Sequence, residues 1–189
     1  MNEQRGLPHR VVAAGVARCI ADSVRMLVGR RVHLRTDHVG MRLGFADGTS
    51  AQVYRETVVD RGPTEDPCVL VVEFRLRAIH GRRAHSLFRG ESLLNTPLFI
   101  GFPGFVSKLW LANDERDVYR GVYEWDDAEL AEHYARCLWR VLELVCVRGS
   151  IQFRVLPGLH RDVLLDEPQA LRVAATEDEQ AWWRLIEVA

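Results

Sequence analysis

The hydrophobic pattern is clearest in residues 118–145, where the period of a strand changes into the period of a helix without a loop between them. Alternate residues from Tyr119 to Trp125 are aromatic or glycine, which is the two-residue period of a strand. Asp126 or Asp127 can then cap a helix, in which apolar residues recur every three or four positions. We therefore expect an aromatic strand that runs directly into an amphipathic helix.

The same criteria predict elements along most of the chain. The predicted helices cover residues 9–28, ended by Gly29, and 83–95, and the predicted strands cover residues 32–35, 39–45, 51–58, 68–77, 105–112, 118–125 and 150–156. Ala46-Asp47-Gly48-Thr49 is a hairpin signal. From residue 68 onward the order is β-α-β-β-α-β, which is the ferredoxin-like α+β arrangement.

Composition divides the chain into four parts. Residues 1–60 are a helix and β-hairpin module, residues 61–67 a linker rich in proline and acidic residues, residues 68–165 the ferredoxin-like domain, and residues 166–189 an acidic C-terminal tail that contains Trp182 and Trp183. The pattern leaves three roles open for the first module: it packs on the sheet, covers a pocket or extends a dimer interface. For the two tryptophans it favours a docked terminal helix or strand.

Two segments carry a resemblance to a known superfamily. Gly-Val-Tyr-Glu-Trp (121–125), followed by a helix whose second turn ends in Tyr134, resembles the third strand and second helix of the dimeric α+β barrel proteins. The preceding PGFVSKLWLANDERDVYRG (103–121) resembles the second strand of the YdhR-like and antibiotic-biosynthesis monooxygenase-like branches. The resemblance covers residues 68–165 and implies a ferredoxin-like fold that forms a dimeric α+β barrel. Many chemistries occur on this scaffold.

A ferredoxin-like sheet has helices on one face only, so we expect its other face to be open. Strict alternation places a mixture of apolar and charged residues there: Val69, Val71, Glu73, Arg75, Val106, Lys108, Trp110, Arg120, Val122, Glu124, Gln152 and Arg154. Two such faces can pack together with ion pairs between them. We therefore predict a homodimer; a solvated face or one covered by the N-terminal module is the alternative.

Composition excludes several classes of function. The formal net charge is −1, so no broad field favours nucleic acid or an anionic membrane. The longest apolar run, residues 11–28, contains three charged residues and cannot span a bilayer. The four cysteines lack metal-ligand spacing and lie in apolar segments, which is typical of buried reduced thiols in a cytoplasmic protein. The basic residues are 24 arginines and one lysine, typical of a GC-rich genome.

The helix predicted over residues 83–95 supplies most candidate site residues. Glu91 falls on its apolar stripe with Phe88, where a carboxylate must be paired or protonated. It is either a general acid or base in a helix–sheet pocket or half of a structural ion pair with an arginine. His85 and Arg89 form the neighbouring stripe, where His85 exchanges protons near neutral pH or lies on a rim without chemistry. Asn95 caps the helix or binds a substrate carbonyl.

Aromatic residues complete the predicted site. Tyr119, Tyr123 and Trp125 share the helix-facing side of their strand, and Tyr134 lies on the helix that follows. Periodicity alone indicates core packing. The resemblance implies that they wall a cavity for planar substrates. We thus expect Glu91, His85 and Tyr123 to be catalytic. We expect the remaining candidate residues of the helix and of the aromatic wall to bind substrate: Phe88, Arg89, Asn95, Tyr119, Trp125 and Tyr134.

We expect no metal, flavin or haem. The seven histidines are scattered without an HxxxH or HExxH pair, and no GxGxxG, P-loop or GxSxG motif is present. The resemblance implies a cofactor-independent monooxygenase-like enzyme for an aromatic or polyketide-like small molecule, in which the deprotonated substrate itself reacts with dioxygen. A cyclase or isomerase needs the same pocket and base. A non-catalytic small-molecule-binding or assembly protein is the alternative from another class.

Overall fold

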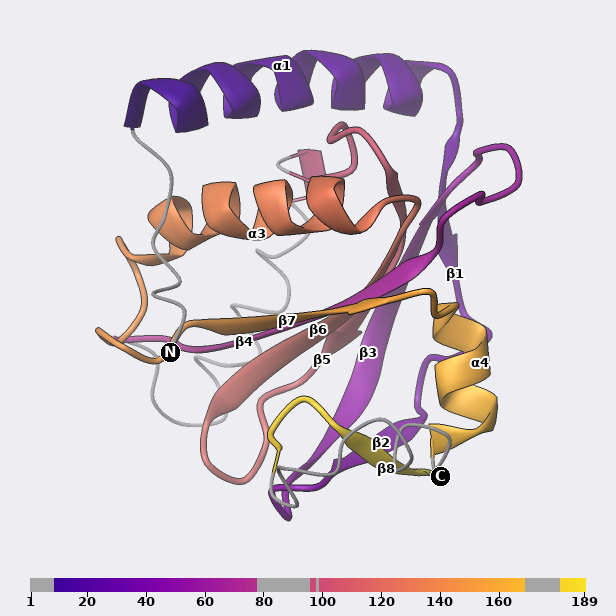
Figure 1. The fold of residues 1–189 in the computed structure, drawn as a ribbon, viewed down its shortest axis with the longest axis vertical. Helices are drawn as coiled ribbons and strands as arrows, with labels where there is room; N and C mark the ends of the chain where they lie inside the picture. Colours follow the sequence, from indigo (N-terminus) through magenta and orange to yellow (C-terminus); the bar gives the residue numbers. More distant parts are fainter. Residues whose placement is uncertain (1–8, 78–95, 98, 169–180) are drawn as a thin grey trace.

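The computed structural model describes residues 9–77, 96–97, 99–168 and 181–189. Its centre is a curled antiparallel sheet in the order β7-β4-β6-β5-β3-β2-β8, with β1 also paired to β3 (Figure 1). The elements are α1 (His9–Val28), β1 (Val32–Arg35), β2 (Arg42–Phe45), β3 (Ser50–Val59), β4 (Cys68–Arg75), β5 (Phe105–Leu111), β6 (Val118–Trp125), α3 (Ala128–Leu142), β7 (Gln152–Pro157), α4 (Arg161–Asp166) and β8 (Leu185–Val188).

The strands β7-β4-β6-β5 form the ferredoxin-like part of this sheet. In chain order they are the fourth, first, third and second strands of the predicted arrangement, so the predicted fold class is confirmed. β3 then pairs with β5 through residues 53–58 and continues the sheet. The helix predicted over residues 83–95 lies outside the described residues. The strands of the N-terminal module thus continue the sheet itself, which differs from each of the three roles that the pattern left open.

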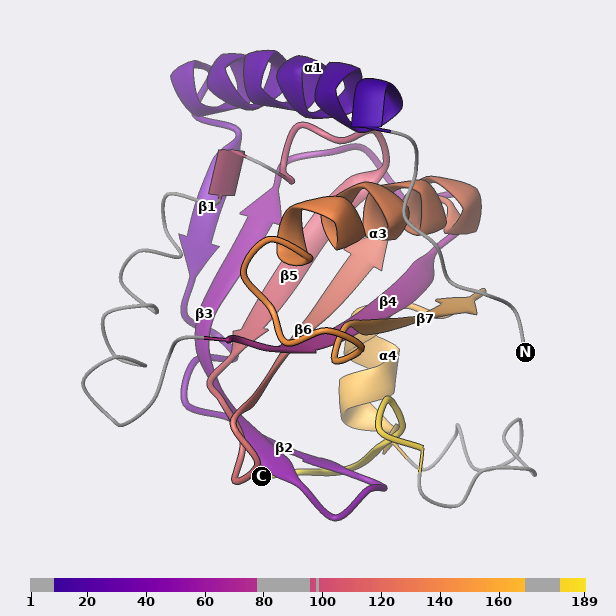
Figure 2. The same ribbon diagram turned by 90° about the vertical axis from the view of Figure 1, so that its left-hand side faces the viewer.

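Helices α1 and α3 lie on the same side of the sheet, with α3 against the strands and α1 across α3 (Figures 1 and 2). Asp127 caps α3, because its carboxylate accepts a hydrogen bond from the backbone N–H of Leu130 at 2.8 Å. The buried stripe of α3 is Ala131, Tyr134, Ala135 and Cys137. The helix ends at Leu142, three residues before the predicted end, which leaves the next residues exposed.

Helix α1 has the predicted bounds, but its last turn closes differently from the expectation. The residue with left-handed backbone is Arg30, at φ 52°, and not Gly29. The N–H groups of Arg30 and Arg31 bond to the carbonyl oxygens of Leu27 and Met26 at 3.1 and 2.9 Å, which is the Schellman pattern of a helix end. This turn brings Arg31 back beside the last turn of α1.

The face away from α1 and α3, which was predicted to be open, is covered within the chain by β2, α4 and β8 (Figure 1). The buried cluster on this face consists of Leu43, Phe45, Ala51, Val53, Val69, Val71, Leu109, Leu111, Val122, Leu156, Leu164, Leu165 and Leu185. The expectation of an uncovered face is therefore wrong, because the N-terminal hairpin and the end of the chain supply apolar residues that the ferredoxin-like pattern lacks. The homodimer that rested on this face stays a prediction.

Strict alternation along residues 105–112 predicted Lys108 and Trp110 on the face away from the helices, and this is wrong. The β5–β6 pairing shifts register between Phe105 and Ser107, where β5 holds one extra residue. Such a shift exchanges the faces of all side chains beyond it. Trp110 therefore joins the helix-side core, and Lys108 faces the same side.

The end of the chain docks as a strand, as one of the two forms expected for it. β8 pairs with β2 of the same chain, and Trp182 and Trp183 pack partly buried against the cluster beneath β2. All four cysteines are free and buried, in line with the sequence. Burial raises the pKa of Cys68 and Cys146 to about 12. None of the helices in the described residues is long and apolar enough to cross a lipid bilayer.

Candidate functional site

The lysine of the chain, Lys108, is buried among aromatic rings on the helix side of the sheet. Its Nζ lies 3.2 Å from the ring centroid of Trp110, 4.6 Å from that of Tyr123 and 4.7 Å from that of Phe99. Its side chain reaches this position because the bulge at the start of β5 turns it toward the helices. Aromatic faces attract a cation through their quadrupole, so these rings partly replace water around the ammonium group.

No acidic group offsets this burial in the described part of the chain. There Lys108 forms neither an ion pair with a carboxylate nor a hydrogen bond. Burial lowers the pKa of the Lys108 ammonium well below its ordinary value, and the nearby charge of Arg55 lowers it further. The guanidinium of Arg55 lies 3.7 Å from the Trp110 ring centroid, so two cationic groups contact one indole ring. Two basic side chains thus lie against the same aromatic ring on the helix side of the sheet.

The orientation of Trp110 is fixed by a buried hydrogen bond. Its Nε1–H donates to Thr57 Oγ1 at 3.1 Å, and Thr57 is the cross-strand neighbour of Lys108 in the β3–β5 pair. Because Thr57 is fully buried, this bond ties the ring to the strand that the N-terminal module adds to the sheet. The rings around Lys108 are thus positioned by β3, β5 and β6 and by the segment that precedes β5.

Three of the predicted aromatic residues come together, and one of them, Tyr123, contacts Lys108. Tyr134 Oη donates to Tyr123 Oη at 3.5 Å, and the rings of Trp125 and Tyr134 lie 4.9 Å apart between centroids. Burial raises the pKa of both Tyr123 and Tyr134, so both phenols stay protonated. The Trp125 Nε1–H is buried and meets no acceptor in the described residues. These rings pack on one another as a core, with one unmatched polar hydrogen.

The other predicted site residues do not join this group within the described chain. Tyr119 lies in a separate cluster with Leu76, Cys146 and Ile151, where its ring stacks on Phe74 at 5.9 Å. The residues of the helix predicted over 83–95 lie outside the described residues: His85, Phe88, Arg89, Glu91 and Asn95. Their roles stay predictions.

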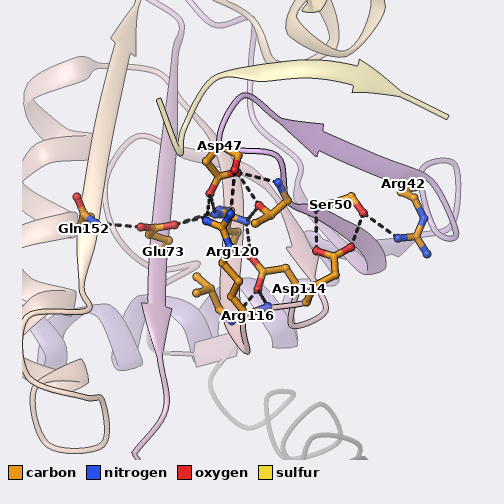
Figure 3. Close-up of polar contacts among 11 residues, drawn as sticks. Arg42, Asp47, Ser50, Glu73, Asp114, Arg116, Arg120 and Gln152 are labelled. Carbon is orange, nitrogen blue, oxygen red and sulfur yellow. Dashed lines mark hydrogen bonds and ion pairs between the residues drawn. The ribbon is translucent and has the colours of Figure 1, made fainter. Parts of the chain in front are cut away.

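On the opposite face, Arg120 of β6 is the centre of a buried ion network (Figure 3). Its guanidinium donates to Glu73 Oε2 at 3.1 Å, to Asp114 Oδ2 at 2.7 Å and to Asp47 Oδ2 at 2.9 Å. A fourth bond reaches Thr49 Oγ1 at 2.8 Å. Burial raises the pKa of Glu73 although Arg120 opposes the effect. Because Asp47 belongs to the β2–β3 hairpin, the network fastens that hairpin to the sheet.

A second network on the same face fastens α4. Arg161 Nη1 lies 3.0 Å from Glu56 Oε1 and donates to Ser107 Oγ at 2.9 Å. The other oxygen of Glu56 bonds to His38 Nδ1 at 2.9 Å, and His160 Nδ1 bonds to Glu124 Oε1 at 2.8 Å. Each buried carboxylate here has a side-chain partner, Arg161 and His38 for Glu56 and His160 for Glu124. The described residues hold no group of three or more His, Cys, Asp or Glu side chains placed to bind a metal.

Sequence reasoning missed Lys108 as a site residue. The signal was present, because Lys108 is a single lysine in a chain with 24 arginines, on an apolar strand. The rule of strict alternation assigned it to the wrong face. No residue type in the sequence signals the bulge that reverses this assignment, since neither glycine nor proline occurs in residues 105–111.

The fold is of the ferredoxin-like α+β class, and comparisons with known proteins add two structures. An uncharacterized ferredoxin-fold protein related to antibiotic biosynthesis monooxygenases, from Listeria monocytogenes 4b F2365, is 13% identical over 60% of this chain and 66% of its own, with a TM-score of 0.43. An anthrone oxidase-like protein is 14% identical over 59% of this chain and 55% of its own, with a TM-score of 0.38. The chain thus spans less than two thirds of either structure, and this likeness carries no information on its reaction. No family model and no curated protein matches the chain.

Proposed function

We propose that the chain is a small cofactor-independent enzyme, monooxygenase-like, that acts on an aromatic or polyketide-like molecule on the helix side of its sheet. The observation that carries the proposal is the position of Lys108, an amine buried against three aromatic rings with a lowered pKa. A buried cation without a counter-charge costs stability. Groups with such perturbed pKa values concentrate at functional sites.

The chemistry assigned to Lys108 is that of a general base. Its lowered pKa favours the neutral amine, which takes a proton from an acidic phenol or from a methylene next to a carbonyl. The ammonium group so formed lies against the aromatic faces, and the substrate anion lies near this ammonium group. An electron-rich anion reacts with dioxygen directly. One dioxygen then converts a CH₂ group into a C=O group and releases one water molecule.

Three predicted residues are assigned roles in this step. Tyr123, whose raised pKa keeps its hydroxyl protonated, is assigned as a hydrogen-bond donor to the developing substrate oxyanion. Glu91 is the competing candidate for the base, and His85 for a later proton transfer. Because only one residue accepts the substrate proton, separate substitutions of Lys108 and Glu91 identify which of the two is the base.

Two alternatives remain on the same residues. A cyclase or isomerase uses the same base without consuming dioxygen. A non-catalytic ligand-binding or assembly protein is favoured by one observation, the mutual packing of Trp125 and Tyr134 as buried core residues. The homodimer and the cytoplasmic location belong to the proposal as well. Light scattering that gives the monomer mass of 21.6 kDa at micromolar concentration contradicts the dimer.

Dioxygen uptake tests the proposal, with 1,8-dihydroxyanthrone as a polycyclic substrate that has an acidic methylene. We expect uptake above the buffer rate by the wild-type chain, and a loss of roughly 10²- to 10⁴-fold in Lys108→Met, as for a missing general base. Glu91→Gln should then retain most of the activity. Loss in Glu91→Gln with full activity in Lys108→Met assigns the base to Glu91 instead. Binding of the probe without uptake or rearrangement of it contradicts the enzymatic function.

A further inference from the structure

A second site lies outside the aromatic core, in an open cleft between α1 and the loop that precedes β5. Its volume is about 340 Å³, and its lining includes Asp22, Arg25, Met26, Arg31, Arg61 and Pro103. The loop passes directly beneath α1 in both views (Figures 1 and 2). This volume is at the lower end of the range of small-molecule sites.

The charge of the cleft is positive and only partly compensated. One carboxylate, Asp22, pairs with Arg25 at 2.8 Å. In the described part of the chain neither Arg31 nor Arg61 forms an ion pair with a carboxylate, and each donates to a backbone carbonyl instead. Arg31 bonds to Asp60 O at 2.9 Å and Arg61 to Phe102 O at 3.2 Å. The three arginines and one aspartate of the lining leave an excess of two positive charges.

Arg61 has the least satisfied side chain of the cleft lining. Its Nε–H is buried and meets no acceptor in the residues that the structure describes. Burial lowers the pKa of the Arg61 guanidinium, and the like charge of Arg31 lowers it further, against an opposing effect of Asp126. A bound anion relieves both the desolvation and the repulsion, because it supplies the missing negative charge between the two guanidinium groups.

The walls of the cleft are held in place before any ligand binds. Ser23 Oγ donates to the carbonyl oxygen of Pro97 at 2.8 Å, which fastens α1 to the segment before β5. Gly101 touches the backbone of α1, where an added Cβ would lie 2.0 Å from the carbonyl oxygen of Cys19. The left-handed turn at Arg30 directs Arg31 back toward α1. Preorganised walls lower the cost of binding a small ligand.

We propose that this cleft binds the oxyanion of a small organic acid or phosphate ester. Arg31 and Arg61 hold the carboxylate or phosphate group, Arg25 contributes when it leaves Asp22, and Met26 and Pro103 contact the apolar part of the molecule. The inference rests on the charge and the walls of the cleft and does not depend on the enzymatic function proposed above.

Calorimetric titration of the full chain at constant ionic strength tests this site, with phenyl phosphate and benzoate as probes. We expect one site per chain, and the probe with the higher affinity identifies the phosphate or the carboxylate source. Arg31→Gln and Arg61→Gln should each weaken binding about tenfold, the effect of one charge-assisted hydrogen bond. Asp22→Asn should strengthen it, because the competing carboxylate is removed.

Arg148→Gln is the matched control, since Arg148 is exposed and lies outside the cleft. It should leave the affinity unchanged. If it weakens binding as much as Arg31→Gln does, the anion sees only the general surface charge and the site does not exist. Absence of binding by both probes at millimolar concentration overturns the proposal equally. If Arg61→Gln fails to fold, the opposite effects expected of Arg31→Gln and Asp22→Asn still decide the question.

Discussion

On the face of the sheet that β2, α4 and β8 cover, Arg120 is buried against three carboxylates, whereas on the helix side Lys108 is buried against aromatic rings. Both are strand residues with under a tenth of their surface exposed. The carboxylates around Arg120 offset much of the free-energy cost of removing it from water, and they tie the hairpin to the sheet. That network therefore has a structural explanation. Among the described residues around Lys108, no carboxylate offsets the cost of its desolvation. The comparison separates a buried charge that is paired within the fold from one whose burial the described residues do not offset.

The largest effect expected from this comparison is the loss of the Arg120 network. Arg120→Gln should destabilise the chain by about 3–5 kcal/mol, because it leaves Glu73 and Asp114 as buried carboxylates without their cation and removes the closer cationic partner of Asp47. Urea unfolding of the variant and the wild type measures the difference. Arg116→Gln is the control, since Arg116 is largely exposed beside the same Asp47 and should cost less than 1 kcal/mol. Equal effects of the two changes contradict a central role of Arg120.

On the helix side, substitution of the buried basic residue is expected to change stability in the opposite direction. Lys108→Met should leave stability unchanged or raise it, by up to about 4 kcal/mol, since an apolar group of similar length replaces a buried charge. The gain depends on pH, because the pKa of Lys108 is lower in the folded than in the unfolded chain. Between the lowered pKa and the ordinary value near 10.5, the unfolded chain binds the extra proton, so wild-type stability rises with pH there.

The advantage of Lys108→Met should therefore be complete below the lowered pKa and vanish as the pH approaches 10.5. Thermal melts of both chains from pH 6 to about 10.5 measure this difference. A variant that is destabilised at every pH shows that the ammonium group has a favourable partner, and the comparison between the two faces then fails.

A smaller loss is expected where the aromatic rings around Lys108 are held. Thr57→Val keeps the shape of the side chain but removes the acceptor of the Trp110 Nε1–H bond, at a cost of about 1–3 kcal/mol for a buried unsatisfied donor. Tryptophan fluorescence and urea unfolding follow the change. Thr36→Val, at an exposed position, should have little effect on either. A Thr57→Val chain as stable as the wild type contradicts the assigned hydrogen bond.

The smallest effect is expected at the rim of the Arg120 network. Gln152 is exposed and donates to Glu73 Oε1 at 3.0 Å, on the side of Glu73 away from Arg120 (Figure 3). Gln152→Ala should cost about 0.5–1.5 kcal/mol, because water replaces the amide. Chemical denaturation detects this difference. A loss as large as that of Arg120→Gln means that the network is not centred on Arg120.

The sequence predicts the elements of this fold well, because their periods and punctuation are local. The strand over residues 118–125, the N-cap of the following helix at Asp127 and the hairpin turn at Gly48 all follow from neighbouring residue types. Two features depend on distant contacts and could not be read in this way. The bulge after Phe105 is visible only in the pairing with β6, and the cover over the second face comes from β8, more than 100 residues after β2.

The same distinction applies to the site. Tyr123, Trp125 and Tyr134 were predicted together because a strand and the helix after it share one face, and they do lie together. Lys108 and Trp110 were assigned to the wrong face because strict alternation does not account for the extra residue of a bulge. The partners of Arg120 are equally hidden from the sequence, since Asp47 and Asp114 lie in turns that only the folded sheet brings to it.

The central claim is that Lys108 carries an amine with a lowered pKa, and the chain offers a direct measurement of it. Because Lys108 is the one lysine in the sequence, incorporation of ¹³Cε-labelled lysine gives a single side-chain NMR resonance without further assignment. Its chemical shift is followed from pH 5 to about 11 in the folded chain, with the urea-unfolded chain as the reference. The account predicts a titration midpoint well below that of the unfolded chain. A midpoint equal to or above the unfolded value contradicts it.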